Sequence, residues 1–459
     1  MFRTIGIWSL TLLVCMSFIG AFDGPAFGGE EEADMSGWEK EAKEFLKTLV
    51  YTEEDVDNWI SNTAFPFCKY DGVVGYLHIS RIFQEGYDKS WVTYSYSPQD
   101  ERTMFLYPNK NCRINTYGNS FTSCEQVNDG ESWQEVLAAH LCEPVRNYGI
   151  GGFSVYQSYR RMIKEENFTP AKYIVLNIFD DDHYRNLISW QRIRFGTHPK
   201  SFHPTLPYVE VNPATGKFVE HDNVCPTEKS LDNMTDLDWI YENFKDDFLL
   251  KICLAQHIAR QGYSGGELRD RHLQTALVEG SDLKSEKKGN ELIYGVIEQL
   301  ATEHGLKDVK LQTPQDLVNV TNELYLNAAL FASMRVVEKA LEYAKANDKE
   351  ILFVLSFPHT STEKMLKTGK RMDQPFVDFL DKNGINYVDT LQAHVEDFAN
   401  FKITPEEYSK RYYVGHYGPA GNFFQAFAMK DQLVEMMDPK PLPYREDHKE
   451  GFFDPSAEY

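Results

Sequence analysis

The chain has 459 residues, of which 42% are hydrophobic, so it can form one large domain with additions or two domains around a substantial core. Asp and Glu number 69 against 47 Lys and Arg, which gives a formal charge of −22. This negative field repels phosphate backbones and anionic lipid. The composition therefore argues against nucleic-acid binding and favours neutral or cationic partners.

The first residues have the layout of a secretory signal. Arg3 supplies a positive charge, residues 5–22 are apolar, and small residues precede an acidic run. We therefore expect a signal peptide over residues 1–28, with cleavage within 26–29, and a secreted or periplasmic protein. An uncleaved membrane anchor is the alternative, because the apolar stretch stands at the short end of a membrane span. We expect no other membrane contact.

Six cysteines remain after this segment: Cys68, Cys112, Cys124, Cys142, Cys225 and Cys253. An even number of cysteines in an exported protein permits disulfides, and buried free thiols are the alternative. Their spacing contains no CxxC pair, which argues against a zinc ribbon.

Residues 35–110 predict a helical and aromatic extension. An amphipathic helix is expected over 38–49, and "TEEDVDNWI" predicts a second helix that Thr52 caps. From residue 111 to 438, strand-like apolar runs alternate with helical runs. The strand-like runs are 113–117, 144–148, 172–179, 350–357 and 385–390, and the helical runs include 130–142, 154–166 and 313–347. This alternation predicts an α/β fold with a parallel sheet between helices.

One segment departs from this alternation, over about residues 204–270. Its pattern predicts a β-hairpin with its turn at 213–216, followed by mixed helix, and we interpret the segment as an insertion at the rim of the site. Residues 439–459 are polar and rich in proline, which indicates a surface tail.

Residues suited to acyl transfer follow the expected strands, where ligands of parallel sheets bind. Ser120 stands where the first strand gives way to a helix, as a nucleophile would, and His416 precedes the last helix, as its general base. The N–H groups of Ser120 and Gly152 would stabilise the negative charge on the carbonyl oxygen. Glycine at 152 lets the backbone approach closely.

Four blocks in this order resemble the SGNH (GDSL-like) hydrolases, in the branch with G-D-S-F-T, N-x-G-x-x-G, N-D-x-x-R-N and D-G-H-x-x-P-x-G. Here they read "GNSFT" from Gly118, "NYGIGG" from Asn147, "DDHYRN" from Asp181 and "VGHYGPAG" from Val414, within residues 112–437. The resemblance implies a three-layer α/β/α sandwich and the hydrolysis or transfer of esters, often acyl groups on carbohydrates. It assigns Ser120, Gly152 and His416 the three roles given above.

The chain departs from the family pattern at several positions. Asn119 replaces the family's Asp before the serine, and Asp181 replaces the Asn that usually donates to the oxyanion. Asp181 could donate only as a protonated carboxyl, which burial and the neighbouring carboxyls would favour. The acid before the base is missing, because Tyr413 and Val414 stand there, and Asp389 is an alternative acid. A Ser–His dyad is the other alternative.

Three interpretations stay open beside the serine esterase. A metal-dependent hydrolase would use Asp180, Asp182 and His183, although consecutive residues rarely converge on one ion, so we expect neither metal nor cofactor. Asp182 and Arg185 would then brace the site. The altered helper residues also suit a glycan-binding protein without activity, and an O-acyltransferase would share the acyl-enzyme. Five aromatic residues would form either a sugar-stacking rim or core: Trp190, Phe195, Tyr412, Tyr413 and Tyr417.

Overall fold

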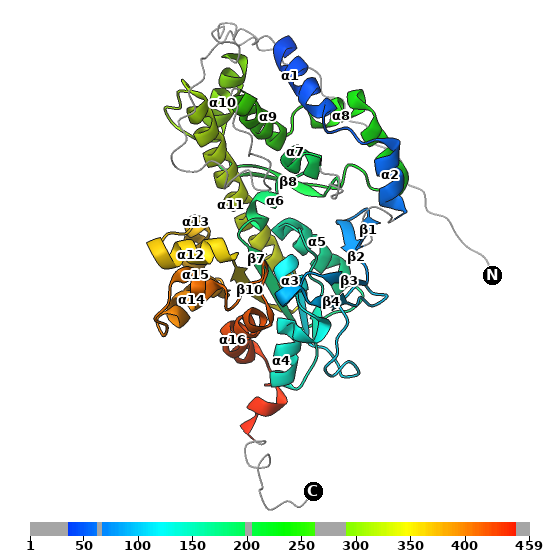
Figure 1. Ribbon diagram of the computed structural model, residues 1–459, viewed down its shortest axis with the longest axis vertical. Coiled ribbons are helices and arrows are strands. Elements are labelled where there is room, and N and C mark those ends of the chain that lie inside the picture. The colour runs from blue at the N-terminus through cyan, green and yellow to red at the C-terminus, as the bar shows by residue number, and fades with distance from the viewer. Residues whose placement is uncertain (1–34, 62–66, 198–203, 262–290, 447–459) are drawn as a thin grey trace, which may run out of the picture.

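The computed structural model describes residues 35–61, 67–197, 204–261 and 291–446 (Figure 1). The expected signal peptide, residues 1–28, lies outside the described residues, as do residues 447–459 of the expected tail. Of the helices within the described ranges, none combines the length and apolar character that crossing a bilayer requires.

A parallel sheet of five strands forms the centre of the molecule, in the order β11-β10-β7-β5-β6. The strands are β5 (Ile114–Tyr117), β6 (Val145–Asn147), β7 (Tyr173–Phe179), β10 (Glu350–Ser356) and β11 (Tyr387–Asp389). Every neighbouring pair is parallel. The expected parallel sheet and its five strand segments are therefore confirmed.

Helices cover both faces of this sheet. Alternate side chains of β7 enter two separate cores, Ile174 and Leu176 on one face and Tyr173 and Val175 on the other. Helices α5 (Val155–Glu166) and α11 (Pro314–Ala346) cover the first face. Helices α4 (Trp133–Leu141) and α16 (Pro419–Met436) cover the second. The fold is thus mixed α/β and compatible with a three-layer sandwich.

Local sequence fixes where these helices begin. Ser154 and Gln157 form a capping box at the start of α5, and Thr313 and Asp316 form another at the start of α11. Each cap satisfies N–H groups that the first helical turn leaves unpaired. Pro419 opens α16, where a missing N–H costs nothing. Helices α3 (Ser120–Ser123), α5 and α6 (Asp182–Arg185) follow β5, β6 and β7 along the chain, so the loops before them lie at the carboxyl edge of the sheet. The loop before α16 meets them there.

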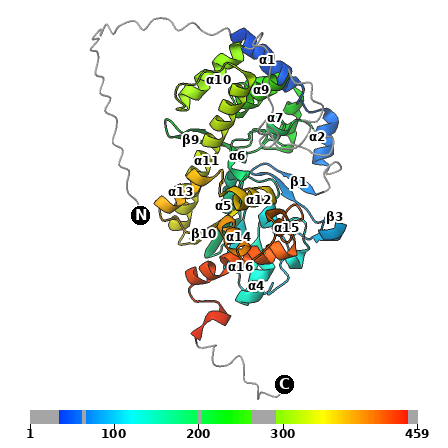
Figure 2. The same cartoon turned by 60° about the vertical axis from the view of Figure 1, so that its left-hand side comes forward.

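A second group of helices lies beyond this edge (Figures 1 and 2). It comprises α1 (Met35–Lys47), α2 (Glu53–Ile60), α8 (Leu237–Phe244), α9 (Phe248–Gln261) and α10 (Glu291–Glu303). Thr52 caps α2 as expected. Helix α10 packs on α9 and α11, so the helical part of the insertion continues past residue 270.

Three antiparallel hairpins complete the sheet structure of the described residues. They are β1 (Cys68–Asp71) with β2 (Gly75–His78), β3 (Arg81–Gln84) with β4 (Trp91–Tyr94), and β8 (Tyr208–Asn212) with β9 (Lys217–His221). The last hairpin confirms the turn expected at 213–216. The shorter helices are α3 (Ser120–Ser123), α6 (Asp182–Arg185), α7 (Gln191–Phe195), α12 (His359–Thr368), α13 (Gln374–Lys382), α14 (Thr390–Phe398) and α15 (Pro405–Ser409). All six cysteines that follow the expected signal segment are free thiols.

Candidate active site

Ser120 lies at a tight turn between β5 and the short helix α3. Gly118 makes this turn possible, because a Cβ atom there would lie 2.1 Å from the Thr122 hydroxyl oxygen. Asn119 caps α3, since its side-chain oxygen accepts a hydrogen bond from the Phe121 N–H at 2.9 Å. The turn leaves Ser120 itself 7% exposed at the carboxyl edge of the sheet.

His416 comes from the loop before α16 and meets Ser120 across the site. Its Nε2 atom lies 2.8 Å from the Ser120 hydroxyl oxygen. The Phe121 ring packs at 5.1 Å from the imidazole, and the histidine side chain remains 29% exposed. The two residues named from the sequence are therefore at the distance that proton transfer requires.

Gln126 contacts the other side of the imidazole, and no motif in the sequence indicates this role. Its side-chain oxygen accepts the His416 backbone N–H at 2.6 Å and lies 3.3 Å from Nδ1. Its amide nitrogen donates to the Glu85 carbonyl at 3.1 Å, which fixes the amide orientation. Because Gln126 offers an acceptor to Nδ1, that nitrogen carries the proton, and the Nε2 lone pair faces Ser120. The amide thus orients the ring as a triad acid would, without the charge.

A turn with left-handed backbone places Gln126 at this position. Cys124 and Gln126 both have left-handed backbone, with φ of 58° and 70°. Such residues persist only where their surroundings hold them. Buried Arg102 supplies this support, because its guanidinium donates to the carbonyls of Ser123, Cys124 and Val127 at 2.5 to 2.7 Å.

Glu125 lies between these two left-handed residues and reaches the opposite side of the imidazole. Its Oε2 atom is 3.8 Å from His416 Nε2, the nitrogen that also contacts Ser120. The turn therefore places an amide at Nδ1 and a carboxylate near Nε2. Neither residue belongs to the four sequence blocks.

The charge state of His416 reflects these surroundings. Burial lowers the pKa of the imidazole below its usual value, and Arg185 adds to the decrease. The carboxylates of Glu125 and Glu85 raise the pKa and oppose the effect of burial. The net decrease favours a neutral imidazole at neutral pH, which is the form that can accept the Ser120 proton.

Two N–H groups are free to bind a developing oxyanion. Gly152 has φ of +81°, and its loop lies against the turn before α3, since the Ile150 N–H donates to the Gly118 carbonyl at 3.0 Å. Among the described residues, the N–H groups of Ser120 and Gly152 donate to no other group. An unpaired N–H at the nucleophile and another on the loop that packs on its turn are donors that an oxyanion hole can use.

The comparisons with known proteins add no assignment. No family model matches the chain, and no curated protein matches it. The resemblance to the SGNH hydrolases therefore depends on the four sequence blocks and on what their residues do in the structure.

Asp181 lies in an ion-pair cluster. Its carboxylate pairs with Arg194 at 2.5 Å and with Arg185 at 3.0 Å. Two guanidinium partners favour the ionised form, which has no proton to donate to an oxyanion. The expectation that Asp181 substitutes for the family's Asn would require a neutral carboxyl, and these contacts oppose it.

Asp182 supports the nucleophile turn directly. Its Oδ1 atom accepts hydrogen bonds from Asn119 at 2.9 Å and Arg185 at 2.8 Å, and its Oδ2 atom accepts the Phe179 N–H. Burial raises the pKa of this carboxyl to about 8, although Arg185 lowers it. The predicted supporting residues Asn119, Asp182 and Arg185 are therefore brought together, and Asn119 links them to Ser120.

The remaining residues of the "DDDH" run point to separate partners. Asp180 accepts from Ser361 at 2.6 Å, and the Nδ1 atom of His183 lies 2.7 Å from the Ser333 hydroxyl. Within the described part of the chain, no group of three or more His, Cys, Asp or Glu side chains could hold a metal ion. The residues of this run therefore make separate structural contacts with different partners.

Three of the five aromatic residues considered as a sugar-stacking rim are instead core residues. Trp190, Tyr413 and Tyr417 are at most 8% exposed. Tyr413 and Val414 stand where an acid would precede the base, and the Tyr413 hydroxyl lies 3.2 Å from Nε2 of buried His394. Asp389, the alternative acid, caps α14 and pairs with Arg371. The position beside His416 Nδ1, where a triad acid would lie, is therefore occupied by Gln126.

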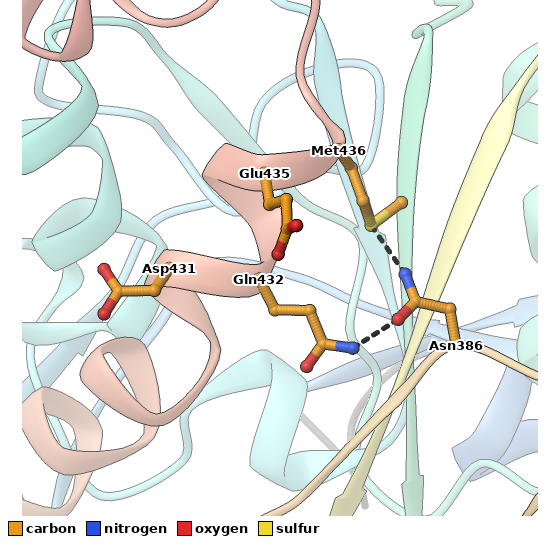
Figure 3. Close-up of a pocket in the computed structure, with 5 residues that line it drawn as sticks. All are labelled: Asn386, Asp431, Gln432, Glu435 and Met436. Atoms are coloured by element: carbon orange, nitrogen blue, oxygen red, sulfur yellow. Dashed lines mark hydrogen bonds between the residues drawn. The ribbon is translucent and has the colours of Figure 1, made fainter.

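A hollow of about 500 Å³ lies away from these residues (Figure 3). Asn386 precedes β11 and therefore stands at the amino edge of the sheet, opposite Ser120. It contacts Gln432 and Met436 of α16, and Asp431 and Glu435 complete the lining. This hollow carries no part of the Ser120 site.

Proposed function

We propose that the protein is a serine esterase of the SGNH type that acts on O-acyl groups through an acyl-enzyme. The observation that carries this proposal is the 2.8 Å contact between Ser120 Oγ and His416 Nε2, with Gln126 at Nδ1. A serine at a tight turn, a neutral imidazole and free N–H donors form the set of groups that acyl transfer needs.

The reaction follows from these positions. His416 Nε2 takes the Ser120 hydroxyl proton as Oγ attacks the ester carbonyl. The N–H groups of Ser120 and Gly152 stabilise the oxyanion while the tetrahedral intermediate exists. The bond to the leaving oxygen then breaks, and the imidazolium returns its proton to the departing alcohol. Water, activated by the same nitrogen, hydrolyses the acyl-enzyme and releases the acid.

The Gln126 amide supports the base in this scheme. It keeps the tautomer and the ring orientation that a triad carboxylate would keep, but it adds no negative charge. Imidazolium formation therefore gains less stabilisation than in a triad with an acid. We expect slow turnover, with the Glu125 carboxylate near Nε2 as the nearest negative charge.

Two other functions use the same groups. An O-acyltransferase would release the acyl group to a hydroxyl of an acceptor in place of water. A glycan-binding protein without turnover is favoured by the missing acid and by the ion pairs of Asp181, at the family's Asn position, with Arg194 and Arg185. That alternative predicts equal glycan affinity for the parent and for Ser120→Ala, with no hydrolysis by either. For all three functions we retain the prediction of a secreted or periplasmic protein with a carbohydrate or small ester ligand.

Substitution of the nucleophile tests the proposal. Ser120→Ala should lower kcat/KM for short-chain aryl esters by about 10³-fold or more, because no oxygen remains to form the acyl-enzyme. Ser123→Ala, in the same short helix, is the matched control and should retain activity within about tenfold. Equal ester hydrolysis by the parent and Ser120→Ala would refute the proposal.

A further inference from the structure

The Glu125 carboxylate lies beside the reacting atoms with unused hydrogen-bonding capacity. Its contacts to His416 Nε2, Arg81 Nη2 and His78 Nε2 measure 3.8, 3.7 and 3.9 Å. All three exceed hydrogen-bond length. Among the described residues, therefore, no group donates a hydrogen bond to this carboxylate, and the side chain is 21% exposed.

The backbone holds Glu125 in this position. Its N–H donates to the Ser120 carbonyl at 3.1 Å, and left-handed residues precede and follow it. Gly151 leaves space for the carboxylate, because a Cβ atom there would lie 2.1 Å from Oε1. The fixed backbone and the space that Gly151 leaves together hold the carboxylate beside His416.

The groups behind Glu125 do not neutralise it by direct bonds. His78 is 3% exposed, and burial lowers its pKa well below the usual value, so the ring is neutral. Arg81 stacks on the Tyr94 ring at 4.2 Å, and its Nε and Nη1 atoms are buried without a partner. Arg81 places a positive charge 3.7 Å from the carboxylate, while the oxygen atoms remain available to a ligand.

The chemistry of the proposed reaction defines what the carboxylate would meet. The leaving oxygen must lie beside His416 Nε2 to receive its proton, and Glu125 Oε2 lies 3.8 Å from that nitrogen. A hydroxyl on the carbon adjacent to the one that bears the leaving oxygen would reach the carboxylate and donate to it. A simple alkyl group there would leave the carboxylate unpaired in a partly buried place.

We propose that Glu125 selects esters whose alcohol carries a vicinal hydroxyl, on the carbon adjacent to the one that bears the ester oxygen, as polyols and sugar rings do. This inference rests on the proposed esterase function and names the leaving-group class of that site. A hydrogen bond to a charged acceptor is worth enough to change kcat/KM by about tenfold to a hundredfold.

The test compares ethyl acetate with ethylene glycol monoacetate, which differ by one hydroxyl. Both esters form the same acetyl-enzyme, so the ratio of their kcat/KM values reports recognition of the leaving alcohol. We expect the parent to favour the hydroxy ester by about tenfold or more, and Glu125→Ala to bring the ratio close to one. Glu125→Gln should give an intermediate ratio, because its amide oxygen still accepts. Glu435→Gln, on exposed α16 surface, should keep the parent ratio.

Three results would overturn the inference. The parent could hydrolyse both esters equally, or Glu125→Ala could keep the parent ratio while its thermal midpoint matches the parent. A preference for acetylcholine over the hydroxy ester that Glu125→Ala abolishes would mean that Glu125 recognises positive charge. The failure of the parent to turn over any of these esters would instead count against the proposed esterase function, and the two failures are distinguishable.

Discussion

Gln126→Leu removes the side-chain oxygen that orients His416 while keeping a side chain of similar size. The His416 backbone N–H loses its 2.6 Å partner, and Nδ1 loses its acceptor at 3.3 Å. A buried donor left without a partner costs about 1–3 kcal/mol. If this cost falls on the oriented state of His416, two such donors, at about 2–6 kcal/mol together, correspond to a loss of about 30- to 10⁴-fold in kcat/KM, at about 1.4 kcal/mol for each factor of ten. Part of this loss arises because the other tautomer, with the proton on Nε2, becomes accessible.

Gln126→Glu separates orientation from charge. The carboxylate keeps both acceptor contacts and loses only the 3.1 Å bond to the Glu85 carbonyl. A negative charge beside Nδ1 favours the imidazolium, so the acid limb of the kcat/KM profile should move to higher pH. The assay is ester hydrolysis across neutral and acid pH, with thermal midpoints as the folding control. Activity of Gln126→Leu within threefold of the parent, or an unmoved acid limb in Gln126→Glu, would refute the role of Gln126.

Three further predictions concern the groups around the site. Asn119→Asp should place a second carboxylate 2.9 Å from Asp182 and cost about 3–5 kcal/mol in urea unfolding, with partial recovery at low pH as one carboxyl takes a proton. Full stability at alkaline pH would contradict this. Arg102→Lys replaces the guanidinium fork, whose Nη1 and Nη2 atoms reach different carbonyls of the turn, by one nitrogen atom, so it should lower ester kcat/KM by about tenfold or more in folded protein. Buried His183 and His394, with pKa values of about 4 and 3, bind protons more readily when unfolded. The free energy of unfolding should therefore be highest above their usual pKa of 6.5 and decrease at lower pH. For His183 the decrease should amount to about 3 kcal/mol as the pH approaches 4, and His183→Gln should lack this part of the pH dependence.

Much of the fold could be predicted because its signals are local. The strand β7 is a continuous apolar run, as a sheet covered on both faces requires, and all seven residues are buried. Capping residues such as Ser154 and Thr313 indicate in the sequence where helices begin. Ser120 and His416 stand beside glycines at expected strand or helix ends, so their meeting could be predicted although 296 positions separate them.

The parts that could not be predicted depend on distant contacts. Gln126 and Glu125 lie in a turn that contains no glycine or asparagine signal, and Arg102 of the extension holds its left-handed backbone. No local signal in the sequence therefore indicates a hydrogen-bond partner for His416 in this turn. Asp181 appeared able to become neutral beside other carboxyls, but Arg194 reaches it from α7. Burial of aromatic residues such as Tyr417 likewise depends on packing that periodicity does not reveal.

The central claim is that the chain positions Ser120 as an activated nucleophile. Treatment of the purified protein with a fluorophosphonate, followed by intact mass and peptide mapping, tests it most directly, because this reagent labels serines that a neighbouring base activates. We predict a single adduct on Ser120 that is lost in His416→Ala and slowed in Gln126→Leu. The absence of an adduct from neutral to alkaline pH, or labelling that His416→Ala leaves unchanged, would contradict the account and favour a glycan-binding protein.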